Sequence, residues 1–182
     1  LDKEIPKKIS YIKIDNQNNL KWKKKLNKFK KPIIALHWQG NIKYSFDELR
    51  SIKLSNFKEI IELEKYTFIS LQKNDGVNQI KINKFESKII DFSNEIDNGQ
   101  NAFEDTISIL NNIDTLITID TAIAHLAATM DVKTYLLLNF SPDWRWHLEL
   151  NNNFFYSNLN ILKKSKLEKW DDVFKELKKI LL

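Results

Sequence analysis

The 182-residue sequence contains no cysteine and no long apolar run. Without cysteine, the protein has no disulfide, no thiolate metal ligand and no cysteine nucleophile. No run approaches the roughly 20 apolar residues that a membrane-spanning helix requires, and the N-terminus lacks the basic-then-apolar layout of a signal peptide. These absences are consistent with a reducing compartment. We expect a cytoplasmic location, with the inner face of the membrane as an alternative.

Glycine is scarce as well, and the three glycines lie far apart: Gly40, Gly76 and Gly99. Neither G-x-G-x-x-G nor G-x-x-x-x-G-K-[ST] can be written with them. A conventional dinucleotide site and a P-loop are therefore disfavoured. A phosphate group would have to bind at a helix N-terminus without a glycine-rich loop, helped by side chains.

Other catalytic signatures are also missing from the sequence. The three histidines, His37, His125 and His147, are too scattered to indicate a metal site, so none is expected. No G-x-S-x-G elbow of a serine hydrolase is present. No carboxylate pair can be assigned to acid–base chemistry, and the catalytic residues are left unassigned.

The composition is that of an ordinary globular protein, with 42% hydrophobic and 29% charged residues. The length allows one good-sized domain with its own core. The first residue is Leu1 rather than methionine, so we expect the chain to be a fragment or an excised domain.

Much of the net charge of +5 comes from a lysine-rich segment between Lys21 and Lys31. Trp22, Leu26 and Phe29 recur within it at helical spacing. We interpret the segment as an amphipathic helix with a solvated lysine face. Binding of nucleic acid, or peripheral contact with an anionic membrane, is the disfavoured alternative.

Apolar runs and helical periodicities alternate along the chain. Strands are predicted at 33–38, 66–71, 88–92, 115–119, 134–138 and 160–163, and helices at 54–63, 103–110, 121–130 and 170–181. This alternation indicates a parallel sheet covered on both faces. We predict a single doubly wound α/β domain at 32–182. It follows a linker and the basic helix at 1–31, of which residues 1–20 are extended.

Four polar loops follow the predicted strands, at 39–43, 72–76, 120–122 and 139–146. In a parallel sheet these loops meet at one edge and form a crevice. Lys43, Arg50 and Lys73 are candidate cations for phosphate oxygens there.

The turn at Asp120 and Thr121 begins the helix 121–130. The first amides of this helix would point at the crevice, with the Thr121 hydroxyl beside them and His125 on the same face. The alternative is structural: Asp120 would be an N-cap and His125 a half-buried histidine. The spacing alone favours neither.

The stretch Ser141-Pro142-Asp143-Trp144-Arg145-Trp146 follows a predicted buried strand. Two tryptophans beside an arginine offer a flat stacking surface and a fixed cation. The alternative is that both tryptophans pack the loop against the domain.

Several of these motifs together resemble one known family. I-D-T-A-I-A-H-L-A at 119–127, L-L-L at 136–138 and P-D-W-R-W at 142–146 resemble the C-terminal half of glycosyltransferase family 9-like proteins. These are relatives of heptosyltransferases, often fused to tetratricopeptide repeats. H-W-Q-G-N at 37–41, R-S-I at 50–52, S-L-Q-K at 70–73 and W-D-D-V at 170–173 extend the resemblance over nearly the whole chain.

The resemblance implies a GT-B fold, in which two Rossmann-like halves face each other. The C-terminal half of such a fold binds the nucleotide-sugar donor. Gly40 and Asn41 would then lie in the first donor loop, and Gln72 and Lys73 in the second, near the nucleotide.

The resemblance also implies roles for the later motifs. Asp120, Thr121 and His125 would hold the diphosphate and the sugar, with the amides that begin at Ala122, while 143–146 would close the site. Enzymes of this kind generally need no metal and no cofactor besides the nucleotide diphosphate sugar. The acceptor site, and usually the catalytic base, lie in the N-terminal half.

We therefore expect the donor-binding half of a GT-B glycosyltransferase, inactive without its N-terminal half. The full protein would transfer a sugar from a nucleotide diphosphate sugar to a glycan, lipid or protein acceptor. The alternative is a non-catalytic, degenerate transferase domain that serves as a sugar-binding or scaffold module.

Overall fold

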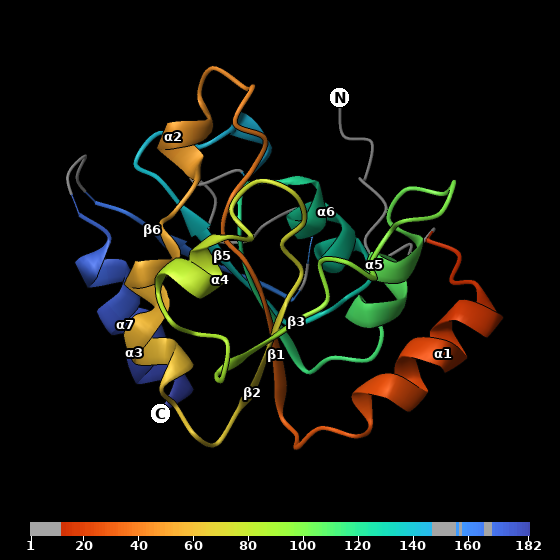
Figure 1. Cartoon of the computed structure of the whole chain (residues 1–182). Helices are drawn as coiled ribbons and strands as arrows, with labels where there is room; N and C mark the ends of the chain where they lie inside the picture. Colours follow the sequence, from red (N-terminus) through yellow and green to blue (C-terminus); the bar gives the residue numbers. More distant parts are fainter. Residues whose placement is uncertain (1–11, 147–155, 157, 166–168) are drawn as a thin grey trace.

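A six-stranded parallel sheet forms the centre of the molecule (Figure 1). The computed structural model describes residues 12–146, 156, 158–165 and 169–182. The strands are β1 (Ile33–His37), β2 (Thr67–Ser70), β3 (Ile89–Asp91), β4 (Thr115–Ile119), β5 (Thr134–Leu138) and β6 (Leu159–Lys163), in the spatial order β3-β2-β1-β4-β5-β6. The chain thus winds outward in both directions from β1 and β4. This confirms the predicted doubly wound α/β fold.

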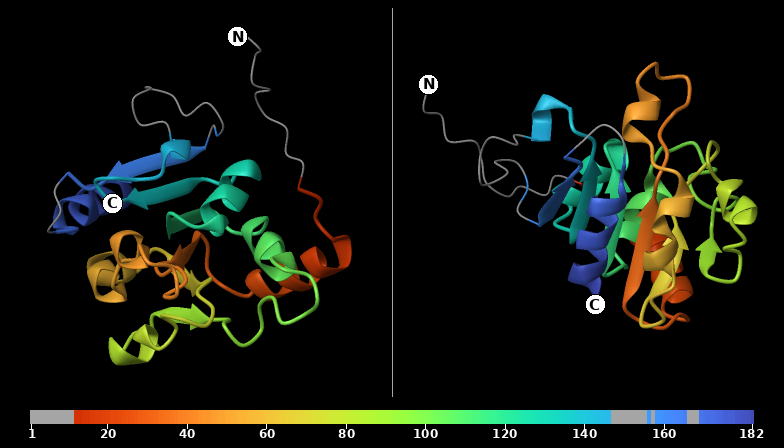
Figure 2. Two further views of the ribbon diagram at one scale, coloured as in Figure 1. Left: turned by 90° about the horizontal axis from the view of Figure 1, so that it is seen from above. Right: turned by 90° about the vertical axis from the view of Figure 1, so that its left-hand side faces the viewer.

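Helices cover both faces of the sheet (Figure 2). On one face lie η1 (Leu54–Phe57), α3 (Lys58–Ile61) and α7 (Asp171–Leu181), and on the other α1 (Asn16–Leu26), α5 (Glu104–Leu110) and α6 (Ala122–Thr129). Three short elements, α2 (Asp47–Arg50), α4 (Gln79–Ile82) and η2 (Trp144–Trp146), follow strands and were not predicted. Each has at most four residues, too few for a periodic signal.

The central strands are apolar throughout because both of their faces are buried. In β1, Ile34 and Leu36 join the core on the α3–α7 side, whereas Ile33 and Ala35 join the core on the α1–α5 side. All residues of β1, β4 and β5 are buried. The apolar runs that predicted these strands therefore reflect two cores rather than one.

The extended conformation predicted for residues up to 20 is wrong for the last part of that range. Helix α1 begins at Asn16, and the Asp15 side chain caps it by accepting a hydrogen bond from the Asn18 amide at 2.7 Å. The helix ends at Leu26, so Phe29 contacts the core from beyond its C-terminus. Residues 15–20 are therefore the capped start of a helix rather than part of a linker.

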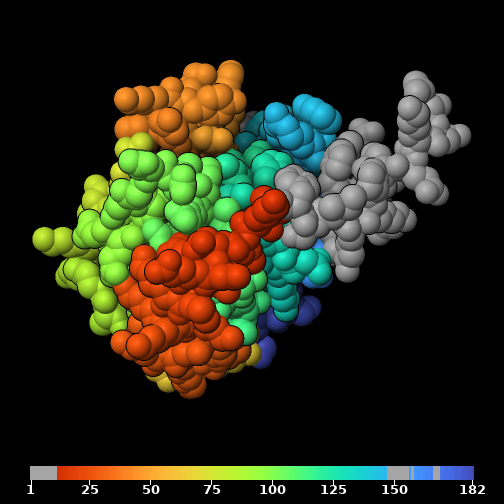
Figure 3. Space-filling model, turned by 90° about the vertical axis from the view of Figure 1, so that its right-hand side faces the viewer, coloured from red at the N-terminus to blue at the C-terminus, as the bar shows by residue number. Residues whose placement is uncertain are grey.

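Helix α1 lies against α5 and the segment after β3 (Figure 3). Trp22 is fully buried, packs edge-to-face on Phe92 at 5.3 Å between ring centroids, and donates its indole N–H to Asp105. Lys21 and Lys25 form ion pairs with Asp105 and Glu95. The predicted boundary at residues 31 and 32 stays a prediction, but α1 packs in the same layer as α5.

Among the described residues, no helix has both the length and the apolar character needed to cross a membrane.

The packing of α1 should contribute measurably to the free energy of unfolding. Trp22→Ala should lower the free energy of unfolding by about 3–5 kcal/mol, because it removes a fully buried indole and leaves Asp105 without its donor. Urea unfolding measures this. Lys24→Ala, on the exposed face of the same helix, should change stability by less than about 0.5 kcal/mol. Equal stability of the two variants would mean that α1 does not belong to the folded unit.

Candidate functional site

A crevice of about 820 Å³ opens at the carboxyl edge of the sheet. It lies where the winding reverses between β1 and β4, the place where doubly wound folds bind their ligands. Loops after β1, β2 and β3 line it together with the start of α6. Of the predicted site residues, those that line the crevice are Gly40, Asn41, Lys43, Arg50, Gln72, Lys73, Thr121 and Ala122. The other five do not line it: Asp120, His125, Asp143, Trp144 and Arg145.

His37 and Thr121 meet at the floor of the crevice. His37 is the last residue of β1, and its Nδ1 lies 3.4 Å from the Thr121 hydroxyl oxygen. Burial, and to a smaller extent the Arg50 guanidinium, lower the pKa of His37 to about 4 against the opposing effect of Asp47. The imidazole is therefore neutral near pH 7. His37 belongs to the H-W-Q-G-N motif but was not predicted as a site residue, although its place at the end of a predicted strand was a signal.

Arg50 joins the two loops on either side of the reversal. Its Nε donates to the Asp47 carboxylate at 2.9 Å, and its Nη1 donates to the Asp120 carbonyl oxygen at 3.3 Å. The guanidinium also lies 4.7 Å from the ring centroid of Tyr44. Arg50 is thus a fixed cation at the crevice wall, with part of its hydrogen-bonding capacity already used.

Gly40 is required by this arrangement. A Cβ at this position would lie 2.3 Å from the Asp47 carboxylate and 2.5 Å from the Arg50 guanidinium. The Gly40 amide donates to the Ser51 hydroxyl at 2.9 Å, and that hydroxyl donates to Asp47 at 2.8 Å. The first loop is therefore held by its backbone against a partly buried ion pair.

Gln72 supports the loops rather than offering polar atoms to a ligand. Its side-chain oxygen accepts from the amides of Trp38 at 3.1 Å and Gln39 at 3.0 Å. Its side-chain nitrogen donates to the carbonyl oxygens of Gln39 at 2.9 Å and Asp75 at 2.8 Å. All the usual hydrogen bonds of this amide are made within the protein.

The ammonium group of Lys73 is likewise hydrogen-bonded within the protein. Its ammonium donates to the carbonyl oxygens of Ile96 and Asp97, both at 2.6 Å, and to the Asn98 side chain at 2.8 Å. These three bonds use its three donors. Of the predicted cations, exposed Lys43 therefore retains the most freedom to meet an anion.

The start of α6 brings backbone hydrogen-bond donors to the crevice. Thr121 is the N-cap residue in extended conformation, and its side chain makes no capping hydrogen bond. The alternative that Asp120 caps the helix is therefore wrong. Ala122 and Ile123 line the crevice, and the first amides of a helix have no acceptor within it. Those amides and the Thr121 hydroxyl form a compact set of donors.

His125 does not line the crevice and packs instead against Trp146 and Tyr156. Its ring stacks on Trp146 at 4.3 Å between centroids, and its Nδ1 lies 2.9 Å from the Tyr156 hydroxyl. Burial is the main cause that lowers the pKa of His125. The half-buried histidine, given above as the alternative, is what the structure shows.

The two tryptophans of the 143–146 segment differ completely in exposure. Trp146 is fully buried, whereas Trp144 is 72% exposed. The Arg145 guanidinium lies 5.6 Å from the Trp144 ring centroid and pairs with Asp143 at 2.7 Å. One tryptophan packs the loop, as the structural alternative expected, and the other forms an exposed surface.

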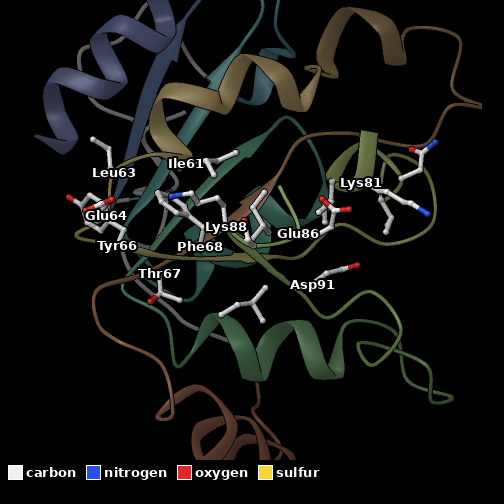
Figure 4. Close-up of a pocket in the computed structure, with 16 residues that line it drawn as sticks. Ile61, Leu63, Glu64, Tyr66, Thr67, Phe68, Lys81, Glu86, Lys88 and Asp91 are labelled. Atoms are coloured by element: carbon white, nitrogen blue, oxygen red, sulfur yellow. The ribbon is translucent and has the colours of Figure 1, made fainter. Parts of the chain in front are cut away.

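A second cavity, of about 790 Å³, lies beside the edge strand β3 (Figure 4). Its lining mixes the acidic Glu64 and Glu86 with the basic Lys81 and Lys88. No predicted site residue lines it, and it does not lie at the reversal of the sheet. Within the described part of the chain, no cluster of three or more His, Asp or Glu side chains could hold a metal ion.

Comparison with solved structures identifies the fold. The E. coli ADP-heptose LPS heptosyltransferase II superposes with a TM-score of 0.60 at 11% identity, over 93% of this chain and 53% of that one. The E. coli heptosyltransferase WaaC with ADP-2-deoxy-2-fluoro heptose gives 0.62 at 9% identity, over 90% and 48%. The family 9 glycosyl transferase from Veillonella parvula gives 0.60 at 15% identity, over 92% and 45%.

These likenesses confirm the resemblance to family 9 glycosyltransferases at the level of the fold. The chain spans about half the length of the structures that it matches. No family profile and no curated protein sequence matches the chain. The class that fold and crevice define is therefore a Rossmann-like domain of the type found in glycosyltransferases.

Because His37 is buried and neutral, the stability of the protein should depend on pH. Because the pKa of His37 is about 4 in the folded state and 6.5 is its ordinary value, the unfolded chain binds the extra proton first as the pH falls. Stability should therefore decline between pH 6.5 and 4, with His37 contributing up to about 3 kcal/mol. His37→Gln should flatten this part of the stability curve measured by urea unfolding. Parallel curves for the two proteins would contradict the neutral, buried state of His37.

Proposed function

We propose that this chain is the donor-binding half of a GT-B glycosyltransferase. The full protein would transfer a sugar from a nucleotide diphosphate sugar to a glycan, lipid or protein acceptor. The single observation that carries the proposal is the crevice at the reversal between β1 and β4, with the start of α6 opening into it. A diphosphate needs such a set of donors, and this crevice has room for a nucleotide beside it.

The chemistry of the crevice floor supports a diphosphate. The amides at Ala122 and Ile123 carry the positive end of the α6 dipole, and the Thr121 hydroxyl adds a further donor. Neutral His37 contributes no charge of its own, so binding would depend on these dipoles, on Lys43 and on Arg50, whose charge is partly offset by Asp47. In transfer, the same donors would stabilise the nucleoside diphosphate as negative charge develops on it.

The similar structures support a donor of this kind. The WaaC structure is described with ADP-2-deoxy-2-fluoro heptose, which is a nucleotide diphosphate sugar. Since this chain spans about half of those proteins, we assign the acceptor site and the catalytic base to a second half. The chain alone would then bind donor without turning it over, and it would require no metal.

A non-catalytic, degenerate transferase domain that serves as a sugar-binding or scaffold module is the second candidate. The ion pair of Arg50 with Asp47 and the three internal hydrogen bonds of Lys73 favour it, because they leave few free cations for a leaving diphosphate. The two candidates differ in one respect. Only the enzyme would release nucleoside diphosphate when the full-length protein is given donor and acceptor.

Calorimetry with UDP-, GDP-, CDP- and ADP-sugars tests donor binding directly. At least one should bind, and Thr121→Val should raise its dissociation constant about tenfold, because one hydrogen bond to a charged phosphate is lost. Thr129→Val makes the same substitution at the other end of α6 and serves as the matched control. The assignment would be wrong if no donor binds, or if both variants bind as the wild type does.

A further inference from the structure

Exposed apolar side chains gather at the carboxyl edge of the sheet. Eleven large hydrophobic side chains of the described residues are exposed. Seven of them lie in the segments that leave the carboxyl ends of β1, β3 and β5: Ile42, Tyr44, Phe46, Leu49, Phe103, Phe140 and Trp144. Trp144, at 72% exposure, is the most exposed of the seven. It is also the largest of them, so it offers the widest flat apolar surface at this edge.

Trp144 is held firmly although its ring is exposed. The next residue but one, Trp146, is fully buried and stacks on His125 of α6. The Trp146 amide donates to the Asp143 carbonyl oxygen at 3.2 Å, and the Arg145 amide donates to the Asp143 carboxylate at 3.0 Å. This closed turn fixes the backbone at Trp144. Its exposure is a property of an anchored segment and not of a loose one.

The polar groups beside the ring suit a sugar. Arg145 pairs with Asp143 at 2.7 Å and lies over the Trp144 ring at 5.6 Å. A pyranose presents C–H groups on one face, which pack on an indole, and hydroxyl groups at its rim. The rim hydroxyls can donate to a carboxylate and accept from a guanidinium. The Trp144 indole therefore suits the C–H face of a pyranose, and the Asp143 carboxylate and the Arg145 guanidinium suit its hydroxyl groups.

The position of Trp144 separates it from the nucleotide part of the site. The crevice extends from Thr121 over β1 toward the loops after β2 and β3. Trp144 follows β5, on the other side of β4 and α6. Trp146 stacks on His125 of α6 at 4.3 Å between ring centroids, which places the 143–146 segment beside the same helix. A diphosphate bound at the start of α6 would thus have its nucleoside on one side and Trp144 on the other.

We propose that Trp144, with Asp143 and Arg145, forms a subsite for a pyranose ring. The ring is the glycosyl group of the donor or a sugar of the acceptor, an assignment that rests on the proposed function. Stacking on Trp144 supplies the affinity of this subsite, and the Asp143–Arg145 pair selects the hydroxyl pattern.

Fluorine NMR of the chain labelled with 5-fluorotryptophan tests this subsite. The sequence has five tryptophans, so five signals are expected, and Trp144→Phe and Trp38→Phe assign two of them. Trp38 donates its indole N–H to the Gly76 carbonyl oxygen beside the crevice and reports on nucleotide binding there. The ligands are UDP, GDP, CDP and ADP, the corresponding nucleotide sugars, and methyl glycosides of common hexoses and heptoses.

The Trp144 signal should shift with sugar-bearing ligands and not with nucleoside diphosphates alone. A shift with nucleotide sugars only assigns the ring to the donor, and a shift with methyl glycosides as well assigns it to an acceptor. An equal shift with a nucleoside diphosphate would identify a nucleobase platform and overturn the proposal. So would the absence of any shift at Trp144.

The two signals also separate this proposal from the proposed function. If the Trp144 signal shifts with glycosides while the Trp38 signal shifts with no nucleotide, the sugar subsite is supported and the proposed donor site is contradicted. Trp144→Ala should weaken binding of the active sugar at least tenfold, and Trp144→Phe should retain part of the affinity. Leu20→Ala, which removes another exposed apolar side chain, on α1, should leave it unchanged. Unchanged binding in Trp144→Ala would contradict the subsite.

Discussion

The hydrogen bonds that the buried carboxylate of Asp47 accepts hold the loops that line the crevice. Asp47 is 5% exposed and accepts hydrogen bonds from Arg50 and from the Ser51 hydroxyl. A buried carboxylate is tolerated only when such donors satisfy it, so these residues are ordered as one unit. Arg50 also donates to the Asp120 carbonyl oxygen. The loop after β1 is thereby tied to the loop after β4, which keeps the start of α6 facing His37.

Local sequence patterns predicted the sheet well, because burial on both faces leaves a continuous apolar run. The runs at 33–38 and 115–119 gave strands correct to within one residue. Residues 16–20 were wrongly predicted to be extended because part of the stabilisation of helix α1 is tertiary. Asn18 donates to the Ser108 hydroxyl, which lies 90 residues away in sequence. No local pattern contains that partner.

The sequence predicted where the candidate site lies, but not which contacts its side chains make. The carboxyl edge follows from strand direction alone, and eight predicted residues line the crevice there. The role of Lys73 depends on acceptors at 96–98, and that of His125 on stacking against Trp146. Such partners come together only in the fold. In the fold, backbone hydrogen-bond donors lie at the start of α6, and an exposed indole lies in the segment that follows β5.

The central claim is that the start of α6, in the crevice at the reversal of the sheet, receives the diphosphate. Amide NMR of the uniformly nitrogen-15-labelled chain, titrated with a nucleoside diphosphate, tests it most directly. The amide signals of Thr121, Ala122 and Ile123 should shift most, with smaller shifts in the loop that carries Lys43. Shifts confined to the cavity beside β3, around Lys81 and 86–88, would contradict the claim.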